Sequence, residues 1–237
     1  MSALTTKRPP TAPRVPGRLA RCVRSFRPAT AVSALLALLM LAGCQKETGW
    51  HETVISGAMP DLALSMTRAE DGKAVTAADY RGKVALLYFG YTFCPDICPT
   101  TLANVATILQ GLGSEADDVR VLFVTVDPDR DTADVLNQYT DAFAPQVDGM
   151  RGTDDQLAAL ARRYRVAYSV TPSDDPAQYK VTHSPAIYVF DRRGTARLLL
   201  SSLGTDKPGA SGAVADLKRL VGERETGGFL ALLEGLL

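Results

Sequence analysis

The sequence is poor in the residues that usually carry metal-binding or nucleophilic chemistry. Its 237 residues include two histidines, four cysteines and one tryptophan, so few clusters of such side chains can form. An excess of positive charge is also missing, because lysine plus arginine and aspartate plus glutamate number 26 each. Nucleic acid is therefore not an expected partner. The length and the 46% hydrophobic composition instead suit a globular domain with a well-buried core.

The first 43 residues contain no acidic residue and seven basic ones, which leaves 19 basic and 26 acidic residues afterwards, a net charge near −7. The apolar run in AVSALLALLMLAGC is about a dozen residues long, too short to span a bilayer. Leu41-Ala42-Gly43-Cys44 resembles the bacterial lipobox, in which the cysteine is lipidated. We predict a lipoprotein signal peptide at 1–43 and an extracytoplasmic protein, on the periplasmic side, anchored in the membrane through Cys44. The alternative, an uncleaved anchor helix, needs more apolar residues than follow Cys44.

Removal of the signal peptide leaves few free thiols. Cys22 is discarded with the signal and Cys44 is capped by lipid, so Cys94 and Cys98 are the remaining pair. An extracytoplasmic compartment is one in which disulfides persist. We therefore expect the two thiols to act together.

Strand and helix patterns alternate along the rest of the chain. Residues 44–58 are polar and read as a tether, 59–222 as the folded domain and 223–237 as a C-terminal tail. The apolar runs predict strands at 61–66, 84–90, 119–127, 186–191 and 196–203, and helical spacing predicts helices at 99–113, 132–143, 154–166 and 212–221. This order favours an α/β class and a thioredoxin-like fold, with a central, mostly parallel sheet flanked by helices.

Cys94 and Cys98 follow the strand predicted at 84–90 and begin the helix after it. A helix amino terminus lowers a thiol pKa, and the i, i+4 spacing places both side chains on one face of a turn. Three roles remain open from the residues themselves. The cysteines could form a structural disulfide, which would close too short a loop to stabilise much, exchange disulfides, or bind a metal.

A metal site needs more ligands, and the two histidines are the strongest candidates. His51 lies in the predicted tether and reads as a solvated linker residue. His183 precedes the strand at 186–191 and, taken alone, is more often structural than a ligand. Two thiolates with one imidazole suit copper better than a closed zinc site, which needs four ligands.

Several motifs, which follow one another along the chain, resemble those of the Sco/SenC family of thioredoxin-like, membrane-tethered copper proteins. They are YFGYTFCPDICPTTL with its CxxxC, TVDPDRDT at 125–132, and HSPAIYVFDRRG. The resemblance covers residues 59–222 and implies Cys94, Cys98 and His183 as copper ligands. Many relatives have aspartate before this histidine, where this chain has Thr182. This departure concerns the affinity for copper more than the presence of a copper site. Asp96, Asp127 and Arg130 match motif positions that could tune the site or recognise a partner, although helix capping and turn formation also account for them.

The resemblance implies a copper chaperone that delivers copper, as Cu(I) or Cu(II) and one ion per domain, to the copper A site of cytochrome c oxidase. Implied partners are the copper A subunit of the oxidase and another periplasmic copper chaperone as a source. The rival functions are a thiol:disulfide oxidoreductase with Cys94 and Cys98 as its redox dithiol, a copper or redox sensor, and a peroxidase suggested only by the fold. The oxidoreductase has no evident need of His183.

Overall fold

The structure, a computed structural model, describes residues 49–171, 179–205 and 207–223. The predicted signal peptide at 1–43, the predicted lipidation site Cys44 and all of the predicted tail except residue 223 lie outside them. No helix among the described residues is both long and apolar enough to cross a membrane. The described residues belong to one compact unit.

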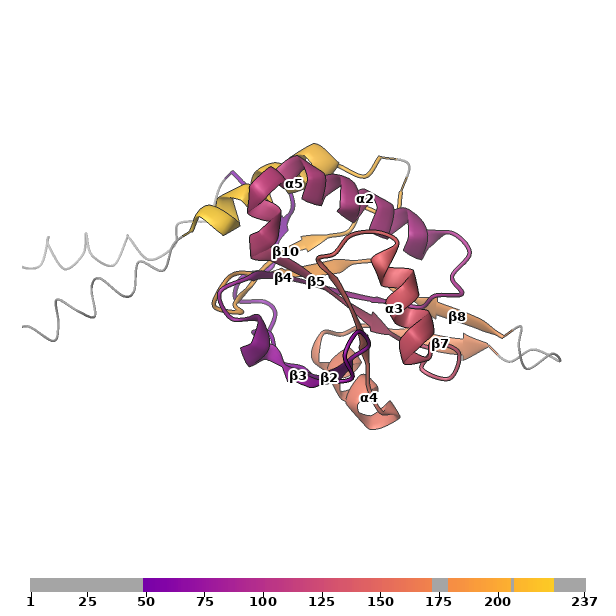
Figure 1. Cartoon of the computed structure of the whole chain (residues 1–237). Helices are drawn as coiled ribbons and strands as arrows, with labels where there is room; N and C mark the ends of the chain where they lie inside the picture. Colours follow the sequence, from indigo (N-terminus) through magenta and orange to yellow (C-terminus); the bar gives the residue numbers. More distant parts are fainter. Residues whose placement is uncertain (1–48, 172–178, 206, 224–237) are drawn as a thin grey trace, which may run out of the picture. The chain divides into compact units, whose positions relative to one another are not determined.

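The unit is built on an eight-stranded sheet with the order β1-β10-β9-β4-β5-β6-β2-β3 (Figure 1). Its strands are β1 (Thr53–Val54), β2 (Ser65–Arg68), β3 (Ala74–Thr76), β4 (Val84–Gly90), β5 (Val119–Thr125), β6 (Val147–Arg151), β9 (Ile187–Phe190) and β10 (Ala196–Leu200). Only β4–β5 and β5–β6 pair in parallel, whereas every other neighbouring pair in this sheet is antiparallel.

The mostly parallel sheet predicted from the sequence is therefore wrong, although the α/β class and the thioredoxin-related fold are confirmed. Helical crossovers join β4 to β5 and β5 to β6, and such connections produce parallel neighbours. Hairpins join β2 to β3 and β9 to β10, and β9 enters beside β4 in the opposite direction. The alternation of strands and helices along the chain did not reveal these reversals.

The central strands form the core because both of their faces are covered. Every residue of β4 is buried, and so is every residue of β5 except Arg120. A continuous apolar run is what a doubly covered strand requires. Burial of these side chains fixes the position of the carboxyl end of β4. The loop that begins there carries Cys94.

Helices cover the sheet on both sides. They are α2 (Ile97–Leu112), α3 (Ala133–Asp141), α4 (Asp154–Arg163) and α5 (Ala210–Gly222), with 3₁₀ turns η1 (Ala77–Tyr80) and η2 (Gly113–Asp118). Figure 1 shows α2 and α5 together on one face and α4 on the opposite one. Thr132 and Thr153 cap α3 and α4 by accepting hydrogen bonds from the backbone N–H of Val135 and Gln156, respectively.

The amino-terminal segment packs on the domain, although the sequence places it in a tether. Thr53 and Val54 form β1, which pairs with β10. The backbone N–H groups of His51 and Glu52 both donate to the buried Asp216 of α5, and His51 Nδ1 lies 3.0 Å from the same carboxylate. The linker role predicted for His51 is thus wrong, although its side chain is 61% exposed, and the folded part begins before residue 59.

A separate two-stranded hairpin precedes β9. Its strands are β7 (Tyr168–Thr171) and β8 (Lys180–His183), which pair antiparallel, with Tyr168 opposite His183. Among the described strands β7 and β8 pair only with each other. His183, the last residue of β8, is therefore carried by an element outside the main sheet.

Candidate metal centre

The two cysteines lie where β4 passes into α2. Cys98 is in the first turn of α2 and is completely buried, whereas Cys94 lies in the preceding loop and is partly exposed. Asp96 occupies the N-cap position but makes no side-chain capping hydrogen bond, so the capping role predicted for it is not formed. A Cβ at Gly90 would lie 2.5 Å from the Phe123 ring and 3.1 Å from Cys98 Sγ. Glycine at this position lets Cys98 pack against the end of β4.

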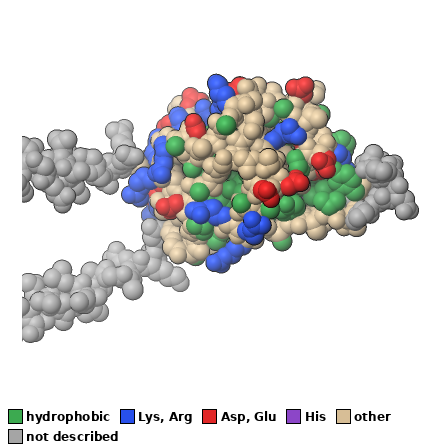
Figure 2. All heavy atoms as spheres, turned by 90° about the horizontal axis from the view of Figure 1, so that it is seen from below, with side chains coloured by type: hydrophobic (Ala, Val, Ile, Leu, Met, Phe, Trp, Pro, Cys, Tyr) green, Lys and Arg blue, Asp and Glu red, His purple; other side chains and the backbone are tan. Residues whose placement is uncertain are grey.

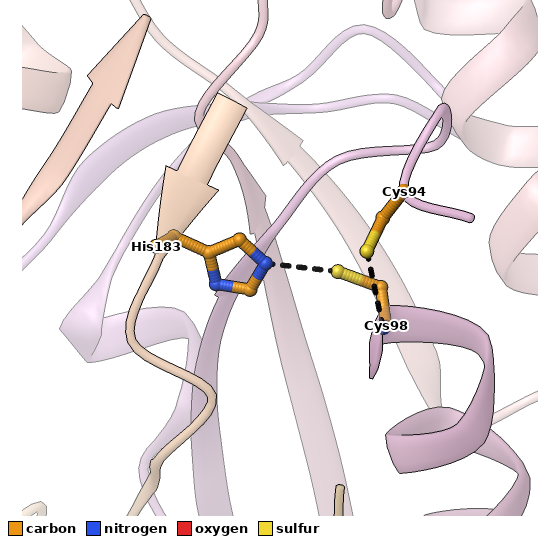
Figure 3. Close-up of side chains that lie close together, drawn as sticks. All are labelled: Cys94, Cys98 and His183. Carbon is orange, nitrogen blue, oxygen red and sulfur yellow. Dashed lines mark hydrogen bonds between the residues drawn. The ribbon is translucent and has the colours of Figure 1, made fainter. Parts of the chain in front are cut away.

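His183 reaches the cysteines from the opposite side (Figure 3). Its Nε2 lies 3.0 Å from Cys98 Sγ, and the backbone N–H of Cys98 donates to Cys94 Sγ over 3.4 Å. The three potential ligand atoms all lie within 4.8 Å of one another. Both cysteines are free thiols, so the disulfide is not formed. The arrangement brings together the three residues that the family resemblance implies.

The imidazole of His183 is held in one orientation. Its Nδ1–H donates to the carbonyl of Ser184 over 3.0 Å, which leaves the lone pair of Nε2 facing the sulfurs. The rings of Tyr88 and Tyr91 meet the imidazole edge-on at centroid distances of 6.1 Å and 5.9 Å. Two aromatic side chains from the β4 end therefore support a ligand that comes from the hairpin.

The two thiols differ in their electrostatics. The hydrogen bond from the Cys98 side chain, aided by His183 and by the backbone N–H groups of Asp96 and Cys98, lowers the pKa of Cys94 to about 3 despite partial burial. The same hydrogen bond with Cys94, together with burial, raises the pKa of Cys98 above its usual range. A negative charge on the pair thus resides at Cys94, the more accessible sulfur, while Cys98 keeps its proton.

A cavity of about 250 Å³ opens onto the site. It is lined by Tyr91, Cys94, Pro95, Asp96, Ile97, Val181, Thr182 and His183. Thr182, on the hairpin, and Asp96, at the start of α2, both line it. The cavity gives a ligand or a partner group direct access to Cys94 and to the imidazole, while Cys98 lies beneath.

Asp127 and Arg130 do not join the ligand atoms. Asp127 is buried in the loop after β5, and Arg130 Nε donates to its Oδ2 over 2.5 Å. The hydroxyl of Tyr179 donates to Oδ1 of the same carboxylate. Sequence reasoning did not identify Tyr179. Its only signal is its place four residues before the candidate ligand His183.

Fold and site together define a class: a thioredoxin-related α/β protein in which a CxxxC dithiol and a histidine from a separate hairpin converge. Residues 66–221 match the family model described as SCO1/SenC. The chain is 35% identical over 173 residues to protein SenC of Rhodobacter capsulatus, covering 69% of this chain and 75% of that relative. This chain belongs to the SCO1/SenC family.

Two other relatives show how far the similarity extends. Identity to the mitochondrial SCO2 homolog of Bos taurus is 42% over 125 residues, which are 52% of this chain and 47% of that protein. The chain thus spans about half the length of the first mitochondrial relatives that it matches. The solved structure of Bradyrhizobium japonicum ScoI with copper bound is similar at a TM-score of 0.60 and 35% identity, covering 68% of this chain and 98% of ScoI.

Proposed function

We propose that this protein is a copper chaperone for cytochrome c oxidase assembly, with Cys94, Cys98 and His183 holding one copper ion as cargo. The observation that carries the proposal is that two thiols and an imidazole, from separate elements, lie within 4.8 Å of one another. Thiolates favour Cu(I) and imidazole suits Cu(II), so this donor set fits copper in either oxidation state. The similar ScoI structure has copper bound, which supports the assignment.

Release of the ion follows from the unequal burial of the two thiols. Cys94 borders the open cavity and Cys98 is buried, so an incoming acceptor thiolate first displaces Cys94. One copper–sulfur bond forms as another breaks, the oxidation state of copper is unchanged, and the proton of the acceptor thiol passes to solvent. The low pKa of Cys94 lets it leave as a thiolate without taking up a proton.

The surface around the cavity suits contact with another protein. Large hydrophobic side chains are exposed beside the site: Phe93 at 56%, Ile97 at 42% and Val170 at 51%. Figure 2 shows hydrophobic side chains gathered at the β7–β8 end of the molecule. The acceptor is the copper A subunit of the oxidase, and another periplasmic copper chaperone serves as the source. Exposed apolar side chains around a transfer site support such brief docking.

The sequence before the domain bears on its location. We infer that a signal peptide at 1–43 directs export and that lipid on Cys44 anchors the domain on the extracytoplasmic side of the membrane. The lipobox LAGC and the apolar run before it support this assignment. Mass spectrometry of the mature protein, which should begin with a lipidated Cys44, tests it.

The experiment that tests the copper site is a titration of the purified chain with Cu(II) and, separately, with Cu(I) under a competing chelator. One ion per chain is expected. Cys98→Ser should lose binding of both ions, whereas His183→Ala should lose mainly Cu(II). Parent-like Cu(II) affinity in both variants contradicts the assignment of the ligands.

Thiol:disulfide exchange is a second candidate that one observation favours. Cys94 has the properties of an attacking thiolate, and Cys98 lies beside it as the resolving thiol. Attack on an acceptor disulfide forms a mixed disulfide and releases one acceptor thiolate. Cys98 then passes its proton to His183 Nε2, 3.0 Å away, and displaces the second acceptor thiolate, so the acceptor gains two electrons and the dithiol is oxidised. The structure thus gives an oxidoreductase a use for His183.

A pre-reduced acceptor separates the two functions. If the chain delivers copper, copper-loaded protein should fill a fully reduced acceptor faster than free copper does. If the chain only reduces the acceptor, copper-loaded protein should give no advantage over free copper.

A further inference from the structure

Arg130 lies between aromatic rings from the two sides of the site. Its guanidinium carbon is 3.7 Å from the centroid of Tyr179 and 4.9 Å from that of Phe93, with Tyr91 at 5.9 Å. Phe93 and Tyr91 belong to the cysteine loop, whereas Tyr179 directly precedes β8. The arginine therefore bridges two segments that supply different ligands. Such stacking of a guanidinium on aromatic rings is attractive.

Tyr179 is held at three points by the loop that follows β5. Arg130 Nη1 donates to its backbone carbonyl over 3.2 Å, the guanidinium stacks on its ring, and its hydroxyl donates to Asp127. The Asp127 carboxylate is 3% exposed and also accepts from Arg130 Nε. Asp127, Arg130 and Tyr179 thus contact one another, and we name these three residues the latch.

The latch acts on the strand that carries His183. The hairpin lacks hydrogen-bonded pairing to the main sheet in the described part of the chain. Its described attachments are the buried side chain of Val181, the partly buried ring of Tyr168, the edge contacts of Tyr88 and Tyr91 with the His183 imidazole, and the latch. Tyr179 directly precedes β8 and His183 ends it. The latch therefore holds the first end of the strand, and the imidazole projects from the last residue.

We propose that Arg130, Asp127 and Tyr179 are positioning residues that hold the His183 imidazole over the two thiols, and that the latch thereby sets the preference of the site for Cu(II). This inference rests on the proposed copper site. Two thiolates from adjacent turns can retain Cu(I) when the imidazole moves away, whereas Cu(II) depends on the nitrogen ligand. Loosening the latch therefore weakens Cu(II) binding and leaves Cu(I) binding nearly unchanged.

Tyr179→Leu is the main test variant, because it removes the ring and the hydroxyl and leaves the Arg130–Asp127 ion pair in place. Arg130→Lys is the second variant: it keeps the charge beside Asp127 but loses the planar stack and the bond from Nε. Arg219→Gln is the matched control, because Arg219 stacks on Trp50 at 3.9 Å in the segment docked on α5. All three are compared with the parent chain by thermal unfolding before copper is added.

Cu(II) affinity should fall about 10–100-fold in Tyr179→Leu and Arg130→Lys, the range seen when residues that orient metal ligands are replaced. Cu(I) affinity should change less than about 3-fold, as should both affinities in Arg219→Gln. The nitrogen coupling in the Cu(II) electron paramagnetic resonance spectrum should weaken in the latch variants. A role confined to folding would lower the unfolding temperature without separating the two oxidation states.

A double-mutant cycle with His183→Ala decides whether the latch works through the imidazole. Tyr179→Leu should have little further effect on Cu(II) affinity once His183 is absent. Equal losses with and without His183 overturn the inference, as does parent-like Cu(II) affinity in both latch variants. Failure of the parent chain itself to bind Cu(II) overturns the proposed function instead, so the two failures are distinguishable.

Discussion

Cys94 should react with a small disulfide reagent at a rate that hardly changes between about pH 5 and about pH 8. Its pKa is lowered from 9.0 to about 3, so the thiol is fully ionised across this range. Below its pKa, an ordinary thiol becomes about tenfold more reactive for each unit by which the pH rises, because only the thiolate attacks. The flat pH profile is therefore the signature of the site.

The absolute rate follows from two opposing effects. At pH 6 a thiol of pKa 9.0 is ionised to roughly one part in a thousand, so full ionisation of Cys94 gains about 10³. Nucleophilicity falls with pKa at a Brønsted slope of about 0.45, which over this shift loses roughly 500-fold. The two nearly cancel near pH 6. Cys94 should be about twentyfold faster than an ordinary thiol near pH 5 and tens of times slower near pH 8.

The assay follows the initial rate of thiopyridone release from a pyridyl disulfide, with mass spectrometry to locate the modified residue. Cys98→Ala is the informative comparison, because it removes the hydrogen bond that contributes most to the low pKa of Cys94. This variant should regain a rate that rises with pH. A tenfold rise per pH unit in the parent chain would falsify the electrostatic account of the pair.

Three further predictions concern packing and charge in the domain. Gly90→Ala places a methyl group 2.5 Å from the Phe123 ring and should destabilise the fold by about 1–3 kcal/mol in chemical unfolding, whereas Gly222→Ala, with no atom within 4 Å of the new Cβ, should be nearly neutral. Burial raises the pKa of Asp148 above its unfolded value, so the stability it contributes is complete below pH 3.8 and is lost as pH rises through the folded pKa. Asp148→Asn should therefore gain stability relative to the parent as the pH rises above 3.8, and a pH-independent difference would refute this. Asp216→Ala removes the acceptor of the backbone N–H groups before β1 and should make that segment more sensitive to limited proteolysis, with parent-like cleavage as the contrary result.

The elements that the sequence predicts well are those whose pattern reflects local burial. The run 84–90 coincides with β4, and the predicted helix at 99–113 matches α2 within two residues at each end. Continuous apolar runs and helical spacing are sufficient for such elements because one face or both faces are covered. β6, with the sequence VDGMR, was not predicted, because its aspartate, glycine and arginine obscure the pattern of a buried strand.

The direction of the strands could not be predicted from these patterns. Antiparallel entry of β9 beside β4, and pairing of β1 with β10, depend on contacts between residues far apart in the chain. The docked segment before β1 was missed for the same reason: its backbone donors meet a carboxylate more than 160 residues away. Polar composition alone made this segment resemble a tether.

The ligand set was predictable, but the contacts around it were not. Spacing pairs Cys94 with Cys98, and only the family motifs single out His183, since a lone histidine before a strand is ordinarily structural. The latch could not be predicted, because Arg130 and Tyr179 are 49 residues apart and meet only after the hairpin folds against the loop following β5. The sequence alone is compatible with two roles for Arg130, turn formation and recognition of a partner, and does not reveal its contact with Tyr179.

The most direct test of the central claim is Cu(II) titration of the purified chain monitored by electron paramagnetic resonance. The structure predicts one Cu(II) per chain with nitrogen coupling from His183 and sulfur coordination from Cys94 and Cys98. His183→Ala should lose the nitrogen coupling, and Cys98→Ser should lose the thiolate-to-copper absorption. A parent spectrum without nitrogen coupling, or one unchanged by His183→Ala, would contradict the three-residue copper site.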